Sequence, residues 1–160
     1  MGLLDVYIIT YIKEAKTMIY TDLTKKALKL CFEAHKDQVD KTGMPYVFHP
    51  FHLAEQMDDE ISTVCALLHD VVEDTDITFK NLIEMGFSIE VVEVLKLLTH
   101  DKSVLYMDYV AKIATNPIAK KVKIADLKHN SDVSRLNVVD QKAQERLKKY
   151  QQALDLLSKG

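Results

Sequence analysis

The sequence has 160 residues, of which 48% are hydrophobic and 28% charged, with a formal net charge of −3 and a pI near 6.1. This length favours one domain with a buried core, and the composition excludes a disordered protein. The net negative charge excludes the global basic field that binds duplex nucleic acid. Cys31 and Cys65 lie in apolar contexts without a C-x-x-C spacing, which predicts free buried thiols and a cytoplasmic protein.

The first residues are apolar but do not form a targeting signal. They lack a basic leader and include Asp5, Lys13 and Glu14, which excludes a signal peptide or a membrane span. We therefore expect an N-terminal arm or helix over residues 1–20 that packs on a domain formed by residues 21–160. Such an arm can pack within one chain or across a dimer, so a homo-oligomer is left open.

Apolar residues recur mainly at helical spacing. With the capping residues they predict helices over about 22–37, 50–58, 60–73, 78–86, 89–99, 103–115, 118–130 and 138–158. An alternating strand pattern is confined to the first ten residues. Glycines and prolines are few, and no internal repeat appears. The pattern predicts an all-α single domain, a bundle of about eight or nine helices.

The stretch "LLHDVVEDT" (residues 67–75) puts four polar side chains into an apolar run. On a helix, His69 and Glu73 lie four residues apart, as do Asp70 and Asp74, so they share one surface. Burying an isolated carboxylate costs several kcal/mol, and a divalent cation can supply the counter-charge. Imidazole and carboxylate together suit Mn, Fe or Zn. The alternative is a solvated helix end with a partly buried histidine.

Three further polar residues strengthen the metal hypothesis. His35 closes the predicted helix at 22–37, and Asp126 follows an apolar run in "VKIADLKHN", with Asn130 four residues later on the same face. A histidine, a His-Asp pair and a distant aspartate from three helices can hold one metal and leave positions open for water and substrate. A salt bridge between Asp126 and Lys123 or Lys128 is the alternative explanation of that carboxylate.

In this order, His35, "GMPYVFHP", "LLHDVVEDT" and "KIADLKHN" resemble the HD-domain phosphohydrolases. The similarity covers roughly residues 22–135 and is greatest to the (p)ppGpp pyrophosphohydrolase half of RelA/SpoT proteins and their small stand-alone relatives. The resemblance implies an all-helical HD fold and removal of the 3′-pyrophosphate from a guanosine nucleotide.

The resemblance also implies a set of site residues. The Mn²⁺ ligands would be His35, His69, Asp70 and Asp126. The pair that handles the nucleophilic water would be Glu73 and Asp74. The nucleotide would be contacted by Lys41, Tyr46 and Asn130. Among divalent metals, Fe, Co and Zn accept the same ligands. His49 in "FHP" matches the family too, and we interpret it as a residue that fixes the loop near the site.

The sequence departs from the family at two places. Asp40 replaces the arginine that packs on the guanosine, and Asp132-Val133 replaces an Arg-Thr pair. A carboxylate at position 40 is expected to repel phosphate and to remove a cation–π partner. Alternative hypotheses are therefore a phosphatase of another nucleotide, such as a nucleoside 5′-monophosphate or NADPH, and a non-catalytic nucleotide-sensing module.

Overall fold

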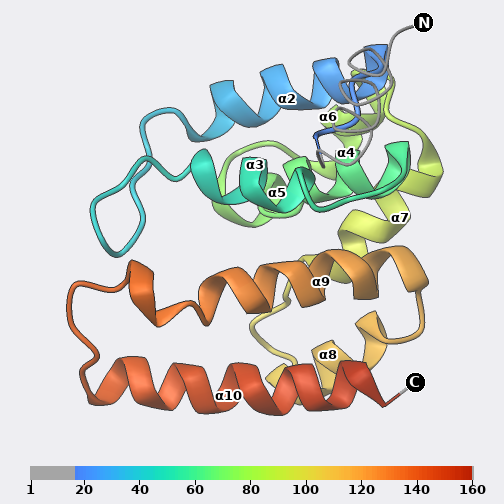
Figure 1. The fold of residues 1–160 in the computed structure, drawn as a ribbon. Coiled ribbons are helices and arrows are strands. Elements are labelled where there is room, and N and C mark those ends of the chain that lie inside the picture. The colour runs from blue at the N-terminus through green and yellow to red at the C-terminus, as the bar shows by residue number, and fades with distance from the viewer. Residues whose placement is uncertain (1–16, 160) are drawn as a thin grey trace, which may run out of the picture.

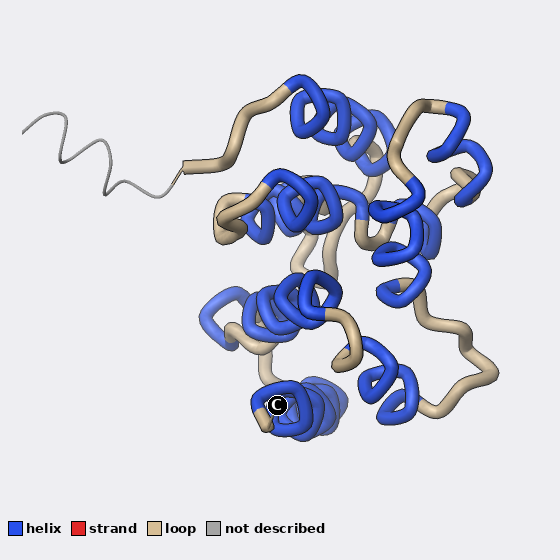
Figure 2. The backbone as a smooth tube through the Cα atoms, turned by 90° about the vertical axis from the view of Figure 1, so that its right-hand side faces the viewer, coloured by secondary structure: helices blue, strands red, loops and turns tan. Residues whose placement is uncertain are grey.

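A computed structural model describes residues 17–159 of the protein. In this part of the chain the secondary structure is helical, and extended residues pair only in an isolated bridge between Val39 and Pro45 (Figure 2). No helix within it is long and apolar enough to cross a membrane. The all-α prediction is confirmed. The expectations for residues 1–16, an arm and a strand, lie outside the described residues.

The upper part of the molecule is arranged around one helix that is buried along most of its length (Figure 1). It contains α2 (Asp22–His35), α3 (Phe48–Ala54), α4 (Glu60–Leu68) and the single turn α5 (Val71–Asp74). Residues 62–68 of α4 are all buried because α2 and α3 pack on one side of it and α9 on another. The uncharged run "STVCALL" permits this position, since burial on all sides leaves no face for charged side chains.

Two short helices follow, each begun by a side-chain cap. Thr78 caps α6 (Phe79–Glu84) with a capping box, and Ser88 caps α7 (Ile89–Leu98) by accepting from the amide of Val91. Gly86, at φ +85°, ends the turn after α6 in a conformation that glycine adopts readily. Both helices were predicted at these places. Among the described residues α7 packs against α4, α6, α8 and α9.

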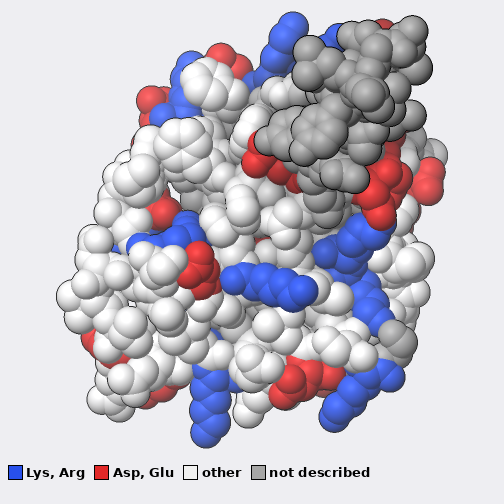
Figure 3. Space-filling model, viewed as in Figure 1, with Lys and Arg blue, Asp and Glu red and all other residues white. Residues whose placement is uncertain are grey.

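The lower layer consists of the C-terminal helices (Figure 1). They are α8 (Tyr106–Ile113), α9 (Pro117–Asn130), the 3₁₀ turn η1 (Val133–Arg135) and α10 (Gln141–Ser158). The helix α9 packs on α4 from below, and α10 closes the layer against α8 and α9. Lys and Arg side chains are interspersed with Asp and Glu on the face seen in Figure 3, as expected for a small net charge.

The structure corrects the predicted helix over 60–73. It ends at Leu68 and restarts at Val71, so His69 and Asp70 form the junction between α4 and α5. His69 Nδ1 lies 2.8 Å from the carbonyl oxygen of Ala66 and donates a hydrogen bond to it. This bond satisfies one of the carbonyl groups that the end of a helix leaves without a backbone partner. The two polar residues therefore stand at a helix break, where their side chains can diverge from one helical face.

Three other helices also differ from the prediction. The helix expected over 50–58 spans Phe48–Ala54 and so ends four residues earlier. The helix expected from 103 begins at Tyr106, because Asp101 binds the amide and hydroxyl of Ser103 in a turn. The helix expected from 138 begins at Gln141, because Asp140 acts as its N-cap. Cys31 and Cys65 are buried and free, as expected.

Candidate active site

The α4–α5 junction holds a buried imidazole beside a carboxylate. His69 is 4% exposed, and its Nε2 lies 3.0 Å from Asp70 Oδ2. Since the Ala66 carbonyl can only accept, Nδ1 is the donating nitrogen and Nε2 faces the site. Burial opposes a charge on this ring, but Asp70 and Asp126 outweigh it and raise the pKa of His69 to about 9. Without a metal the ring therefore holds a proton at Nε2 near pH 7, and a cation bound between the same carboxylates would replace that proton.

The second carboxylate comes from α9. Asp126 is 5% exposed and accepts hydrogen bonds from Lys123 Nζ at 2.8 Å and Asn130 Nδ2 at 2.6 Å. Its Oδ1 also lies 3.1 Å from His49 Nε2 and 3.9 Å from His69 Nε2. Burial disfavours its charge, yet Lys123 and the two histidines hold the pKa of Asp126 far below its ordinary value. The carboxylate therefore stays ionised, and its salt bridge with Lys123 is buried within the site rather than on the surface.

His35 enters the site from the end of α2. It is 1% exposed, and its Nδ1 lies 2.8 Å from Gln38 Oε1. Its Nε2 is a buried nitrogen without a hydrogen-bond partner among the described residues. The His35 ring meets Tyr46 edge-on at 5.0 Å, and the Tyr46 hydroxyl donates to Asp70 Oδ2. An unpaired buried imidazole nitrogen is costly unless a cation or ligand uses it.

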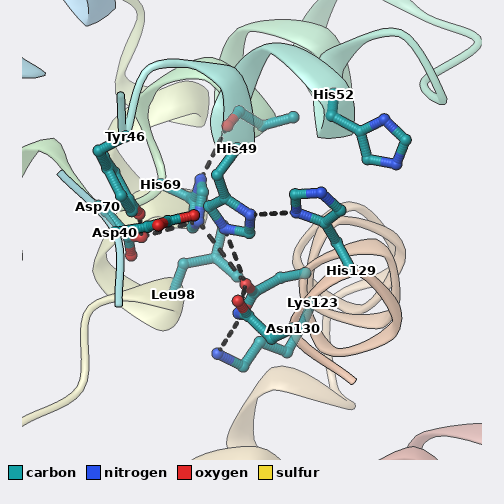
Figure 4. A network of polar contacts seen from close by, with 12 residues as sticks. Asp40, Tyr46, His49, His52, His69, Asp70, Leu98, Lys123, His129 and Asn130 are labelled. Atoms are coloured by element: carbon teal, nitrogen blue, oxygen red, sulfur yellow. Dashed lines mark hydrogen bonds and ion pairs between the residues drawn. The ribbon is translucent and has the colours of Figure 1, made fainter. Parts of the chain in front are cut away.

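His49 is closer to the centre than its interpretation as a loop residue implied. His49, His69 and Asp70 each place one potential ligand atom within 4.8 Å of the others, whereas the predicted ligands His35 and Asp126 are outside this group. Both ring nitrogens of His49 already have partners, however: Nε2 faces Asp126, and Nδ1 lies 2.6 Å from His129 Nδ1 (Figure 4). These contacts suit a residue that orients the Asp126 carboxylate.

A line of histidines continues from this point toward the surface (Figure 4). His129 stacks on His49 with ring centroids 4.9 Å apart and meets His52 at 4.4 Å. Burial and the neighbouring His49 and Arg135 lower the pKa of His129 to about 4, so this ring is neutral near pH 7. Arg135 Nη1, which can only donate, lies 3.2 Å from His129 Nδ1, so this nitrogen accepts and the His49 ring donates to it from Nδ1.

A cleft of about 470 Å³ opens above these residues. All the predicted site residues except His35 and His69 line it, namely Lys41, Tyr46, Asp70, Glu73, Asp74, Asp126 and Asn130. Glu73 Oε2 accepts the backbone N–H of His100 at 3.0 Å, which fixes the carboxylate at the cleft edge. Burial, together with Asp70 and Glu73, raises the pKa of Asp74. A raised pKa suits a carboxylate that accepts a proton during a reaction.

A second cavity of about 290 Å³ adjoins the cleft and shares part of its lining. Lys41, Tyr46, Asp74, Asn130 and Tyr150 line both spaces. The second cavity adds residues that were not predicted, among them Arg135 and Arg146. The apolar spacing of α10 indicated that Tyr150 faces inward, but no sequence signal placed Arg135 opposite the 38–46 loop.

Arg135 changes the expected effect of Asp40. Its Nη2 lies 3.2 Å from Asp40 Oδ2, and its Nη1 donates to the carbonyl of His129 at 2.8 Å. The other oxygen of Asp40 accepts from the amides of Thr42 and Met44 and from the Thr42 hydroxyl. These hydrogen bonds and Arg135 outweigh burial and lower the pKa of Asp40. Its charge is thus paired, and the predicted repulsion of phosphate is offset.

Comparison with known proteins relates this site to a group of nucleotide hydrolases. The guanosine-3′,5′-bis(diphosphate) 3′-pyrophosphohydrolase of Spiroplasma citri is 32% identical over 136 residues, 75% of this chain and 18% of that protein. The mouse enzyme of this name, MESH1, is 32% identical over 114 residues, 62% of this chain and 63% of that protein. No protein-family model matches the sequence.

A solved structure has the same helical arrangement. It is described as a metazoan orthologue of SpoT that hydrolyses ppGpp and plays a role in starvation responses. It superposes with a TM-score of 0.69 at 25% identity and covers 89% of each chain. The chain spans less than two thirds of the curated relatives it matches, and only 9% of the Aquifex aeolicus enzyme. In sequence and in fold, the chain is a relative of the RelA/SpoT-type HD-domain hydrolases.

Proposed function

We propose that the protein is a Mn²⁺-dependent phosphohydrolase that removes the 3′-pyrophosphate from (p)ppGpp. The observation that carries the proposal is the convergence of two carboxylates on one buried imidazole nitrogen, with His69 Nε2 3.0 Å from Asp70 Oδ2 and 3.9 Å from Asp126 Oδ1. The names of the relatives, ppGpp pyrophosphohydrolases, supply the substrate. Within this proposal the protein acts in the cytoplasm, where its two buried thiols stay reduced.

The side chains fit a divalent metal. We assign His35, His69, Asp70 and Asp126 as its ligands, because two neutral imidazole nitrogens and two carboxylates match the preferences of Mn²⁺. The unpartnered Nε2 atom of His35 and the two carboxylates that face His69 Nε2 support the assignment. A cation bound there supplies Lewis-acid polarisation of the phosphoryl group and of an attacking water. His49 orients Asp126 in this arrangement, and Gln38 orients His35.

The residues at the cleft edge have complementary tasks. Glu73 and Asp74 receive the proton that the water loses as its oxygen attacks phosphorus, and the bond from phosphorus to the ribose 3′ oxygen breaks. Pyrophosphate leaves, and the 3′ oxygen gains a proton. Tyr46 and Asn130 line the cleft and its adjoining cavity, where they can contact the nucleotide, and Lys41 offers a cation to phosphate.

Steady-state hydrolysis with Mn²⁺ tests this function. We expect pyrophosphate release from ppGpp, and His69→Ala and Asp70→Ala should abolish both metal content and release. A protein in which both variants keep metal and activity contradicts the proposal. GMP and NADPH belong in the same assay, because Asp40, paired with Arg135, stands where the family has the arginine that packs on the guanosine. Brisk turnover of NADPH without turnover of ppGpp would assign the site to a phosphatase. A nucleotide that stays bound and intact with Mn²⁺ would instead assign a sensing module.

A further inference from the structure

Asp40 and Asp132, at which the sequence departs from the related hydrolases, both position Arg135. Asp132 begins the turn η1 by accepting the amide and the hydroxyl of Ser134, and Arg135 is the last residue of that turn. Asp40 accepts from the Arg135 guanidinium, with 3.2 Å between Oδ2 and Nη2. One departure therefore builds the turn that carries Arg135, and the other holds its charged end.

The second nitrogen of the guanidinium reaches the end of α9. Arg135 Nη1 donates to the carbonyl of His129 at 2.8 Å and lies 3.2 Å from His129 Nδ1. A guanidinium has no acceptor, so His129 Nδ1 accepts, and the proton of this neutral ring is at Nε2. Arg135 thus fixes which nitrogen of His129 carries the proton.

His129 passes this constraint to the buried centre. Its Nδ1 lies 2.6 Å from His49 Nδ1, which donates to it, and His49 Nε2 lies 3.1 Å from Asp126 Oδ1 (Figure 4). His49 and Asp126 are 3% and 5% exposed, so solvent has little access to their contact. With Nδ1 held by His129, the ring directs Nε2 at the carboxylate. This orientation is needed both for a His49 that donates to Asp126 and for a His49 that binds the metal beside it.

We infer that Arg135 is a positioning residue of the metal centre and acts on Asp126 through two histidines. The contacts run from the 38–46 loop to the carboxylate in the order Asp40, Arg135, His129, His49 and Asp126. The inference rests on the proposed function for the metal, and it gives the two departures from the family a common task at that site. Loss of the hydrogen bonds that orient metal-binding side chains lowers metal affinity by about 10- to 100-fold.

Mn²⁺ titration without nucleotide tests the role of Arg135. Calorimetry on the metal-free full chain should give a dissociation constant about tenfold higher for Arg135→Ala than for the unchanged protein. The direction of the change is diagnostic. Removing a positive charge near a metal site by itself strengthens the binding of another cation, so a general charge effect has the opposite sign. An unchanged or a higher Mn²⁺ affinity in Arg135→Ala would overturn the inference.

Two further variants separate charge from geometry. Lys128 is exposed on α9 and lines neither the cleft nor the second cavity, so Lys128→Ala removes the same charge and should not weaken Mn²⁺ binding. Arg135→Lys keeps the charge, but a compact ammonium lacks the fork that meets Asp40 and His129 together. It should bind Mn²⁺ nearly as weakly as Arg135→Ala. Full affinity in Arg135→Lys would reject a positioning role.

Variants of His129 test the route. His129→Asn keeps an acceptor oxygen near the position of Nδ1 and should retain most of the Mn²⁺ affinity, whereas His129→Leu should lose about tenfold or more. In the His129→Leu background, Arg135→Ala should have no further effect, because the two residues act in series. A second tenfold loss in that background would show that Arg135 acts by another route, and equal affinities of His129→Asn and His129→Leu would reject the histidine link.

Thermal unfolding of the metal-free variants, followed by circular dichroism, separates a folding defect from lost binding. If Arg135→Ala does not fold, Arg135→Lys and the two His129 variants carry the same comparison. Because the titration needs no turnover, it is independent of the substrate. No hydrolysis of ppGpp together with the loss of Mn²⁺ affinity would reject the proposed function and keep the role of Arg135. Hydrolysis of ppGpp with equal Mn²⁺ affinity in Arg135→Ala and the unchanged protein would reject that role alone.

Discussion

The guanidinium of Arg135 and the carboxylate of Asp40 form an ion pair, 3.2 Å from Nη2 to Oδ2, between residues 95 positions apart in sequence. Their side chains are 29% and 18% exposed, so the pair is shielded partly from water. The pair joins the 38–46 loop to η1 across the second cavity. A carboxylate that appeared to oppose nucleotide binding thus positions a cation beside the pocket.

The variant Asp40→Arg should destabilise the protein. It removes the acceptor for Thr42 and Met44 and puts a second cation beside Arg135, at a cost of about 2 kcal/mol. Urea unfolding measures the change. Asp40→Asn is the control, because the amide keeps an acceptor oxygen and removes only the charge, so its loss should be smaller. A lower KM for ppGpp in a fully stable Asp40→Arg protein would show that the loop side chain contacts the base directly.

His35 and His49 should differ in their effect on the metal. If His49 orients a ligand, His49→Ala should lower the Mn²⁺ affinity by about 10- to 100-fold. If His35 is itself a ligand, His35→Ala should lower the Mn²⁺ affinity further. Mn²⁺ titration followed by calorimetry gives both dissociation constants. The opposite order would make His49 the ligand, in agreement with its position within 4.8 Å of His69 and Asp70.

The acidic pair should affect turnover without affecting the metal. Glu73→Gln and Asp74→Asn are expected to lower kcat by about 10²- to 10⁴-fold, because each removes a group that accepts a proton. The bound Mn²⁺ per chain should stay as in the unchanged protein, measured by elemental analysis. Asp76→Asn, an exposed carboxylate two residues beyond and outside the cleft, should change neither quantity. Normal turnover in both Glu73→Gln and Asp74→Asn would exclude them from the reaction.

The N-cap of α4 should make stability depend on acid pH. Burial opposes the charge of Asp59, but hydrogen bonds from Ser62 and the nearby Lys121 lower its pKa to about 2. The folded state therefore binds this proton more weakly than the unfolded state. The stabilisation by Asp59 is complete above about pH 4, which is the ordinary pKa of an aspartate in the unfolded chain. It is lost as the pH falls toward 2, the pKa of Asp59 in the folded state.

Asp59→Ala should accordingly lower the free energy of unfolding at pH 7 by about 1 kcal/mol. Its stability should vary less between pH 4 and 2 than that of the unchanged protein, as measured by urea titrations at several pH values. Asp58→Ala is a useful comparison, since Asp58 meets Lys121 but caps no helix. An equal loss in the two variants would attribute the effect to Lys121 rather than to the cap.

Most helices were predictable because their signals are local. Thr78, Ser88 and Asn116 cap the helices that follow them, and Gly86 ends a helix, as their residue types indicate. The break at His69–Asp70 was not predicted. The apolar spacing continues through it, whereas the bond from the His69 ring to the Ala66 carbonyl depends on side-chain packing.

The residues of the candidate site also divide into those that the sequence predicts and those that only the folded structure brings together. The sequence by itself predicted which residues could carry the chemistry, since His69, Asp70 and Asp126 stand in apolar runs where a polar group needs a partner, and the family resemblance added His35. Tertiary structure alone decided that His49 faces Asp126, that Arg135 pairs with Asp40, and that α10 brings Arg146 to the second cavity and Lys149 to the cleft. Such contacts join segments far apart in the chain, and their geometry follows from helix packing, which no local pattern encodes.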